Sequence, residues 1–341
     1  MGSRTGLRLD YLSLAEFKAA RWAGVMGVAS FDGARLGQRD SDIPVAEINT
    51  PVLGAQEVLC EVWRTQQRVE PGTRGRIRYA RTADMLFGCI AISESDVAAA
   101  QQTPLHEATE QAYREILSTL DALGFPHLVR VWNYFPEINR DTHGTERYRQ
   151  FNSARQTALL ANARPVAGNV SAACALGATI GSPLVIYFLA SHSAPIFVEN
   201  PRQMSAYNYP PQYGARSPVF SRATVLQETA GLTLFISGTA SIIGHQTIHV
   251  GDPAAQTRET VNNIAALLEE ANRVTGSKEF TLQTLACKVY VRNPQDLPVI
   301  QRELGAAFGS SPRAVYLLAD ICRRDLSVEI EATAMVATTG V

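Results

Sequence analysis

The chain carries one pattern of apolar segments twice, and this internal repeat constrains its fold more than any other feature of the sequence. Leu86 opens one apolar strand and Leu234 opens another. A threonine follows each leucine at a spacing of 23 residues, at Thr109 and Thr257. Each threonine lies early in a segment with the apolar spacing of an amphipathic helix. We therefore expect two similar units in one chain.

Both helical segments begin with the same start signal. Thr103 and Asp252 are suitable N-cap residues, and each precedes a proline at the first helical position. Gly124 is suited to end the first helix, because glycine adopts the left-handed backbone conformation without steric cost. After each helix we expect a strand, a second and shorter helix, and a closing pair of strands that ends at 184–190 or 326–334.

The predicted order β-α-β-α-β-β therefore occurs twice, and it indicates an α+β fold of two tandem units with helices on one face of each mixed sheet. Residues 20–80 contain strand-like segments without a long helix, and could complete the first unit or form a degenerate third one. The expected divisions are an N-terminal extension, a first unit, a connecting segment and a second unit, at 1–84, 85–193, 194–224 and 225–336.

Composition excludes several classes of protein. The 341 residues carry a formal net charge of −1, which gives no general attraction to nucleic acid or to a membrane surface. The five cysteines are scattered and form no CxxC pair, so neither a disulfide framework nor a zinc site is indicated. A reducing compartment, the cytoplasm, is therefore expected.

No cofactor or metal is expected. His245 and His249 lie four residues apart, but the sequence around them is typical of a loop or strand and offers no nearby third ligand. The chain contains neither a phosphate-binding P-loop nor a GxGxxG fingerprint.

One uncharged segment, Val170–Ala190, is long enough to span a bilayer. Gly181-Ser182-Pro183 interrupts it, and its second half is rich in β-branched and aromatic residues. We therefore expect two buried strands joined by a turn rather than a membrane helix.

The connecting segment 194–224 contains five prolines and three tyrosines. Flexible linkers are instead rich in Gly and Ser, and an irregular segment of roughly 30 residues inside a compact protein is usually functional. We predict an ordered segment that lines and closes a pocket.

Two carboxylates stand out in the last apolar strand. Glu329 and Glu331 alternate along VEIEA and so face the same side of the strand. They could lie on a solvated face, or one could serve chemistry in a buried site, since burying a carboxylate without a partner is costly. The corresponding strand of the first unit has Val185-Ile186-Tyr187. The fold therefore does not require an acid there, which favours a functional role.

The second unit contains three runs, LFISGTASIIG, AAQTRETVNNIAALLEEA and ICRRDLSVEIEATA, which resemble the RidA/YjgF fold. A second such unit ahead of it, joined by YNYPPQYGARSPVFSRA, resembles the chorismatase family over roughly 85–336. The resemblance implies an enzyme that cleaves chorismate to pyruvate and either 3-hydroxybenzoate, 4-hydroxybenzoate or a dihydroxycyclohexadiene carboxylate.

The resemblance also implies roles for single residues. Glu329 would be the central acid/base, with its pKa raised by desolvation. Cys322 would steer the reaction toward an aromatic product, because family members that make 3-hydroxybenzoate carry a cysteine at this spacing. Gly238 would offer a small side chain beside the substrate.

Chorismate is a dianion, so its site needs two separated cationic groups, preferably guanidinium groups. The resemblance implies Arg155 and Arg216 for this role, with Tyr148 and Tyr213 as hydrogen-bond donors. Tyr148 and Arg155 are seven residues apart, which in a helix is two turns and one face. Surface charge and ring packing remain the alternatives for these four residues.

Two other functions stay open. RidA-type enamine/imine deaminases place a substrate-binding Arg in a P-A-R run 15 residues before the strand Glu, whereas Arg313 lies 16 residues before Glu329. A non-catalytic RidA-like ligand-binding protein is the other alternative. RidA proteins are trimers with sites between subunits. Two fused units supply such contacts within one chain, so a monomer that acts on the small molecule chorismate is expected, and an oligomer is the alternative.

Overall fold

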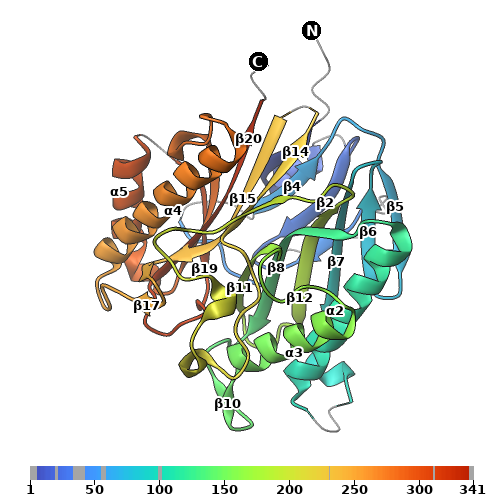
Figure 1. The fold of residues 1–341 in the computed structure, drawn as a ribbon, viewed down its shortest axis with the longest axis horizontal. Coiled ribbons are helices and arrows are strands. Elements are labelled where there is room, and N and C mark those ends of the chain that lie inside the picture. Colours follow the sequence, from blue (N-terminus) through green and yellow to red (C-terminus); the bar gives the residue numbers. More distant parts are fainter. Residues whose placement is uncertain are drawn as a thin grey trace.

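Three β-sheets pack against one another at the centre of this protein, and the helices lie on their outer sides (Figure 1). The computed structural model describes residues 6–19, 22–33, 43–54, 59–98, 102–229, 231–309 and 312–337.

The N-terminal residues form a four-stranded sheet of their own, in the order β1-β4-β2-β3. Its elements are β1 (Arg8–Ser13), α1 (Leu14–Ala19), β2 (Val25–Ser30), β3 (Val45–Glu47) and β4 (Leu59–Arg64). The next two strands, β5 (Glu70–Arg74) and β6 (Ile77–Arg81), instead join the sheet of the first unit. That sheet therefore begins at residue 70, upstream of the expected division at residue 85.

The first unit has a six-stranded sheet in the order β11-β8-β12-β7-β6-β5, covered by two helices. After β6 the chain forms β7 (Met85–Ile92), the short 3₁₀ helix η1 (Glu94–Asp96), α2 (Pro104–Leu123), β8 (His127–Pro136), the hairpin β9 (Asp141–Thr142) and β10 (Thr145–Glu146), α3 (Arg147–Ala161), β11 (Ala172–Ala178) and β12 (Leu184–Ser191).

The second unit repeats this plan with the strand order β13-β14-β15-β20-β18-β19. It comprises β13 (Ile196–Val198), η2 (Ala206–Asn208), η3 (Pro211–Tyr213), β14 (Ala223–Glu228), β15 (Gly231–Ala240), β16 (Ile242–Ile243), β17 (Gln246–Thr247), α4 (Pro253–Thr275), η4 (Leu282–Thr284), β18 (Leu285–Val291), η5 (Pro294–Asp296), α5 (Leu297–Phe308), β19 (Arg313–Leu318) and β20 (Val328–Val336). The predicted α+β fold with two units of order β-α-β-α-β-β is confirmed.

The helix signals seen in the sequence have the expected structural role. The side chain of Thr103 accepts a hydrogen bond from the backbone N–H of His106, and Asp252 accepts one from Ala255. Gly124 ends α2 with a φ of 76°, in the left-handed region.

The uncharged segment Val170–Ala190 forms the buried strands β11 and β12, as predicted. The turn between them contains Gly181 with a φ of 85°. Within the described ranges, no helix combines the length and apolar character that a membrane crossing needs.

The strands of the second sheet have two different faces. Val328 and Ile330 of β20 pack toward α4 and α5, whereas Glu329 and Glu331 point the other way, into the space between the three sheets. That space is filled mostly by aromatic rings from different sheets. For example, the ring centroids of Trp63 and Trp132 lie 5.7 Å apart.

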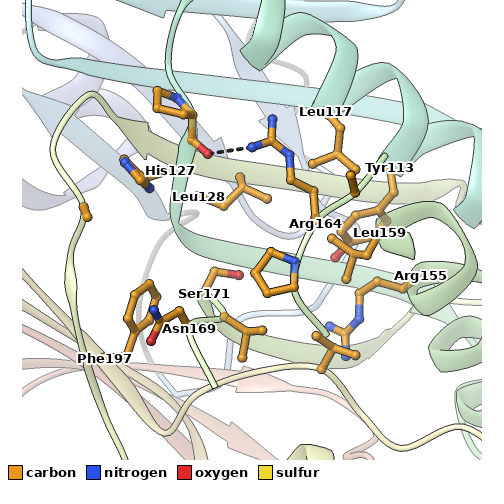
Figure 2. Close-up of a pocket in the computed structure, with 16 residues that line it drawn as sticks. Tyr113, Leu117, His127, Leu128, Arg155, Leu159, Arg164, Asn169, Ser171 and Phe197 are labelled. Carbon is orange, nitrogen blue, oxygen red and sulfur yellow. Dashed lines mark hydrogen bonds between the residues drawn. The ribbon is translucent and has the colours of Figure 1, made fainter. Parts of the chain in front are cut away.

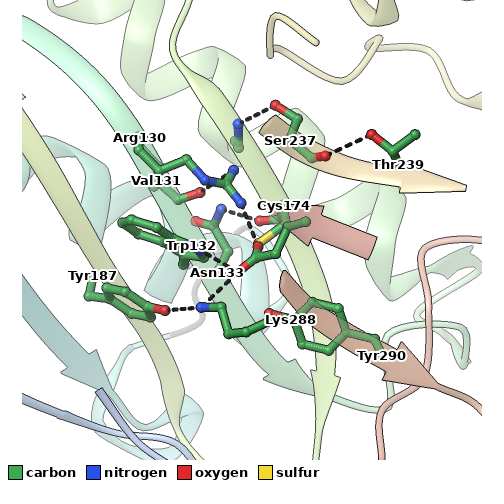
Figure 3. A network of polar contacts seen from close by, with 12 residues as sticks. Arg130, Val131, Trp132, Asn133, Cys174, Tyr187, Ser237, Thr239, Lys288 and Tyr290 are labelled. Atoms are coloured by element: carbon green, nitrogen blue, oxygen red, sulfur yellow. Dashed lines mark hydrogen bonds and ion pairs between the residues drawn. The ribbon is translucent and has the colours of Figure 1, made fainter. Parts of the chain in front are cut away.

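Lys288 of β18 joins all three sheets at this centre. Figure 3 shows its contact with Tyr187 of the first unit's sheet. Its ammonium forms ion pairs with Glu61 of β4 and Glu331 of β20, each at 2.6 Å, and donates to the hydroxyl of Tyr187 of β12 at 2.6 Å. Arg130 of β8 pairs with the second oxygen of Glu331 at 2.5 Å. Two cations and two anions therefore balance one another in the interior, as buried charges require.

Candidate active site

A cavity of about 400 Å³ lies where the connecting segment, the first turn of α3 and the last strand β20 come together. This volume suits a single small-molecule ligand. Its lining residues are Glu146, Tyr148, Arg149, Tyr209, Tyr213, Pro218, Phe220, Arg222, Gly238, Ala240, Ile242, Cys322, Arg323, Arg324, Asp325 and Glu329. Five of the seven site residues expected from the sequence are among them: Tyr148, Tyr213, Gly238, Cys322 and Glu329.

Glu329 is the most deeply buried acid of the cavity, with 3% of its surface exposed. Burial, and then the negative charge of Glu331, raise its pKa to about 8. Arg130, Cys322 and Arg222 act in the opposite direction but do not cancel this effect. At neutral pH the Glu329 carboxyl therefore holds its proton and can act as an acid.

Glu331 has a different environment, although it lies on the same face of the same strand. Burial alone would raise its pKa, but the ammonium of Lys288 and the guanidinium of Arg130 outweigh burial and hold the pKa below the usual value. The indole N–H of Trp132 also donates to it at 2.9 Å. Glu331 is thus an ionised member of the central network, and it does not line the cavity.

Gly238 makes the position of Glu329 possible. It lies at an irregularity in the pairing of β15 with β20, between Ile236 and Thr239. A Cβ atom added at Gly238 would lie 1.9 Å from Oε1 of Glu329, which is far inside any real contact. A residue with a side chain would therefore displace the carboxyl group.

Cys322 lies beside the same carboxyl group. Its Sγ atom is 3.8 Å from Oε2 of Glu329 and donates toward it. Burial, together with the neighbouring Glu329, raises the pKa of the thiol well above its usual value. Cys322 is therefore a neutral S–H group at physiological pH rather than a thiolate.

The two tyrosines expected at the site line the cavity in different ways. Tyr148 is the second residue of α3, and burial raises the pKa of its hydroxyl. Tyr213, in η3, donates its hydroxyl proton to the backbone carbonyl of His245 at 2.7 Å. Its ring lies 4.2 Å from the guanidinium carbon of Arg323. Tyr213 therefore presents mainly its ring to the cavity.

The expected cationic pair is not at this cavity. Arg216 is exposed in the connecting segment, and Arg155 lines a different cavity. Arg313, at the position nearest to the substrate-binding Arg of the deaminases, donates to the backbone carbonyl of Leu9 in β1. None of these three arginines lines the cavity that holds Glu329.

Two other arginines supply positive charge there. Arg222 is 3% exposed, and its Nη2 donates to the carbonyl of Met204 at 2.6 Å and to the hydroxyl of Tyr209 at 2.8 Å. Arg323 donates to the carbonyl of His245 at 2.8 Å. Nε of Arg222 and Nη2 of Arg323 are buried without a hydrogen-bond partner among the described residues.

Such unsatisfied cationic donors are costly unless a ligand completes them. The ring of Tyr209 lies 5.6 Å from the guanidinium of Arg222 and 5.2 Å from that of Arg323. The cavity therefore combines two preorganised guanidinium groups with one protonated carboxyl group. Arg222 lies in the connecting segment and Arg323 directly follows Cys322, but no pattern in the sequence assigned either residue to the site.

One family model and several known proteins are similar to this chain. The family model described as chorismatase FkbO/Hyg5-like, N-terminal, matches residues 61–190. A 3-hydroxybenzoate synthase of Streptomyces hygroscopicus is 36% identical over 307 residues, which is 87% of this chain and 87% of the relative. A chorismatase of the same organism is 37% identical over 279 residues, covering 81% of this chain and 79% of the relative.

A solved structure is similar to this chain over almost its whole length. The crystal structure of a chorismatase at 1.08 Å resolution superimposes with a TM-score of 0.85 and 32% sequence identity. The match covers 97% of this chain and 98% of that chain.

Proposed function

The chain belongs to the chorismatase family, and we propose that it is an enzyme that cleaves chorismate to pyruvate and 3-hydroxybenzoate, with 4-hydroxybenzoate as a competing product. The observation that carries this proposal is that one cavity is lined by a buried, protonated Glu329 and by two guanidinium groups that have unused donors. Of the curated relatives, the one named for its product is a 3-hydroxybenzoate synthase, which supports the aromatic product.

In this proposal, Arg222 and Arg323 hold the two carboxylates of chorismate. They replace Arg155 and Arg216 in the role expected from the sequence, because both side chains line the cavity of Glu329 and each has a donor without a partner among the described residues. A guanidinium group binds a carboxylate with two parallel hydrogen bonds and so fixes its orientation as well as its charge. Tyr148 is assigned to position the substrate from the side of α3.

The proposed chemistry begins with the proton on Glu329. Its carboxyl group protonates the methylene carbon of the enolpyruvyl group, while the bond between ring carbon C3 and the ether oxygen breaks. The electron pair of that bond leaves with the oxygen, which becomes the keto oxygen of pyruvate. The C4 hydroxyl oxygen attacks C3 and gives its proton to the Glu329 carboxylate, which restores the acid.

The bond between C4 and the epoxide oxygen then breaks, C3 loses its hydrogen as a proton, and the oxygen that remains on C3 gains a proton, which gives 3-hydroxybenzoate. The atoms of chorismate divide between pyruvic acid and hydroxybenzoic acid without added water, oxidant or reductant. The neutral thiol of Cys322, next to Glu329, is assigned to donate a hydrogen bond to the carboxylate that forms during turnover. A neutral donor suits this role, because a thiolate would repel the carboxylate. The thiol is also assigned to relay the ring proton, giving its S–H proton to the oxygen on C3 and taking the proton that C3 loses.

The test is chromatography of the products after incubation with chorismate, for the wild type, Glu329→Gln and Cys322→Ala. Loss of a general acid typically costs a factor of about 10² to 10⁴, so we expect Glu329→Gln to reduce turnover to this extent. Cys322→Ala is expected to slow aromatisation and to change the product ratio.

Glu269→Gln is the matched control, because Glu269 is exposed on α4, outside the cavity. Wild-type rates and products in both site variants would disprove the assignment. Tight binding of an aromatic acid without turnover in the wild type would instead establish a ligand-binding protein.

A further inference from the structure

A second cavity, of about 320 Å³, lies between α2, α3, the start of β8 and the connecting segment (Figure 2). Its inner wall contains the buried side chains of Tyr113, Leu117, Arg155, Leu159 and Val219. Exposed residues such as Asn169 and Ala194 form its rim. None of its lining residues lines the cavity of Glu329.

Arg155 gives this cavity a specific polar group. The side chain is 3% exposed, and its Nη2 donates to Oδ1 of Asn152 at 3.1 Å. Its guanidinium carbon lies 5.2 Å from the ring centroid of Phe151. Nε has no hydrogen-bond partner among the described residues. In Figure 2 the side chain extends from α3 toward the interior of the cavity. A buried cationic donor without an acceptor is costly, and an anionic ligand would complete it.

The charges around the cavity favour an anion. Its lining contains Arg155, Arg164 and His127, and no aspartate or glutamate. Asp121 of α2 pairs with Arg164 nearby, and Arg164 also donates to the carbonyl of Pro126 at 3.1 Å. The Nε of Arg164, like that of Arg155, is buried without a hydrogen-bond partner among the described residues. Arg164 has Asp121 as its counter-ion, whereas no described carboxylate pairs with Arg155, so Arg155 is the lining cation whose charge is not compensated.

The rest of the inner wall is apolar. Leu117, Leu159, Val170 and Val219 are buried there, and the aromatic rings of Tyr113 and Phe197 also face the cavity. A ligand that fits must therefore combine one anionic group with a compact apolar body. The volume is sufficient for a single substituted ring.

We propose that this cavity is a second ligand site that binds a single-ring aromatic carboxylate, with the carboxylate on Arg155 and the ring between Leu117, Leu159 and Val219.

The second cavity shares two structural elements with the first. Along the connecting segment, Pro218, Phe220 and Arg222 line the cavity of Glu329, whereas Val219 between them lines the second cavity. The first turn of α3 supplies Tyr148 to the first cavity, and Arg155 further along the same helix lines the second. A ligand in the second cavity is therefore expected to change turnover in the first. This consequence for turnover, and the binding of a carboxylate in the first cavity, rest on the proposed function, whose products are aromatic carboxylates. Binding in the second cavity does not, and the equivalent that Ala194→Trp removes measures it.

The binding test is equilibrium dialysis with 3-hydroxybenzoate and with benzoate, without chorismate, on the full chain. The wild type is expected to bind two equivalents. Ala194→Trp, which fills the rim, should bind one equivalent, and Arg155→Leu should weaken one site by about tenfold or more. Ala161→Trp is the matched control, because Ala161 is exposed at the end of α3 and does not line the cavity.

The proposal would be overturned if the wild type bound one equivalent of carboxylate and Arg222→Leu bound none. It would also be overturned if Ala194→Trp bound two equivalents. If Arg155→Leu fails to fold, Ala194→Trp still decides the question. Benzoate should also change kcat at saturating chorismate in the wild type but not in Ala194→Trp, and an unchanged wild-type kcat would refute the coupling. Absence of chorismate turnover would refute the proposed function and leave the count of bound carboxylates as a separate result.

Discussion

Replacing Glu329 with glutamine is expected to stabilise the folded protein in alkaline solution, although the same change should reduce turnover by a factor of about 10² to 10⁴. The pKa of Glu329 is about 8 in the folded protein, compared with 4.5 in an unperturbed chain. As pH rises through this range, the unfolded chain releases the proton while the folded protein keeps it. The unfolded state then binds fewer protons, so the stability of the wild type falls with increasing pH.

The size of this effect follows from the difference between the pKa of Glu329 in the folded protein and its pKa in the unfolded chain. This difference spans about 3.5 pH units, and each unit corresponds to about 1.4 kcal/mol, so the cost approaches about 5 kcal/mol at pH 8. Above pH 8 both states are ionised and the cost stays constant. Glutamine has a similar shape and cannot ionise. Its advantage should therefore be less than about 1 kcal/mol at pH 5 and about 4 to 5 kcal/mol at pH 9.

The assay is urea unfolding of the wild type and Glu329→Gln at these two pH values, with the free energy of unfolding obtained by linear extrapolation. Glu269→Gln makes the same chemical change at an exposed carboxyl and is the matched control. An equal effect of Glu329→Gln at both pH values, or a loss of stability at pH 9, would refute the assignment of a buried, protonated carboxyl.

Three further predictions follow from the same site and the central network. The rate constant kcat/KM for chorismate should fall as pH rises through about 8, because the acid form of Glu329 is the active one, and a flat pH profile between about 6 and 9 would contradict this. Gly238→Ala should reduce turnover by about 100-fold or more, because the added Cβ would displace the Glu329 carboxyl, while circular dichroism should show that the variant is folded. Wild-type activity in this variant would show that the carboxyl tolerates movement. Lys288→Met should lower the free energy of unfolding by about 3 to 5 kcal/mol, since it leaves Glu61 and Glu331 without their shared cation. An unchanged midpoint of urea unfolding would contradict a stabilising role of this ion-pair network.

The sequence predicted the two units well because their signals are local. An N-cap residue followed by proline, and an apolar stripe at helical spacing, act within a few residues of one another. The N-terminal sheet was harder to predict. Its strands are short, and β1 pairs with β4, which lies far along the chain. Whether these segments complete one sheet or form another depends on pairing between distant residues, which no local pattern encodes.

The sequence indicated those residues of the site that lie in one short, recognisable segment. Glu329, Cys322 and Gly238 lie close together in space, in segments that the sequence had singled out. Which arginines face the cavity depends on how the connecting segment packs. Arg222 enters because Met204 and Tyr209 hold its guanidinium, whereas Arg216 in the same segment remains exposed.

The different roles of Glu329 and Glu331 were also beyond local analysis. The two residues are equivalent by alternation along β20. The partner that fixes the ionisation of Glu331 from the first unit, Arg130, lies 201 residues away in the chain.

The three partners of Lys288 have a consequence for how the chain folds as it is synthesised. Glu61 and Tyr187 leave the ribosome well before Lys288, which belongs to the last third of the sequence. Until that lysine emerges, the two earlier sheets would have to enclose the Glu61 carboxylate without its counter-ion, which is strongly unfavourable. The nascent protein is thus kept from closing its interior early, and a truncated chain that lacks β18 would keep that interior open to water.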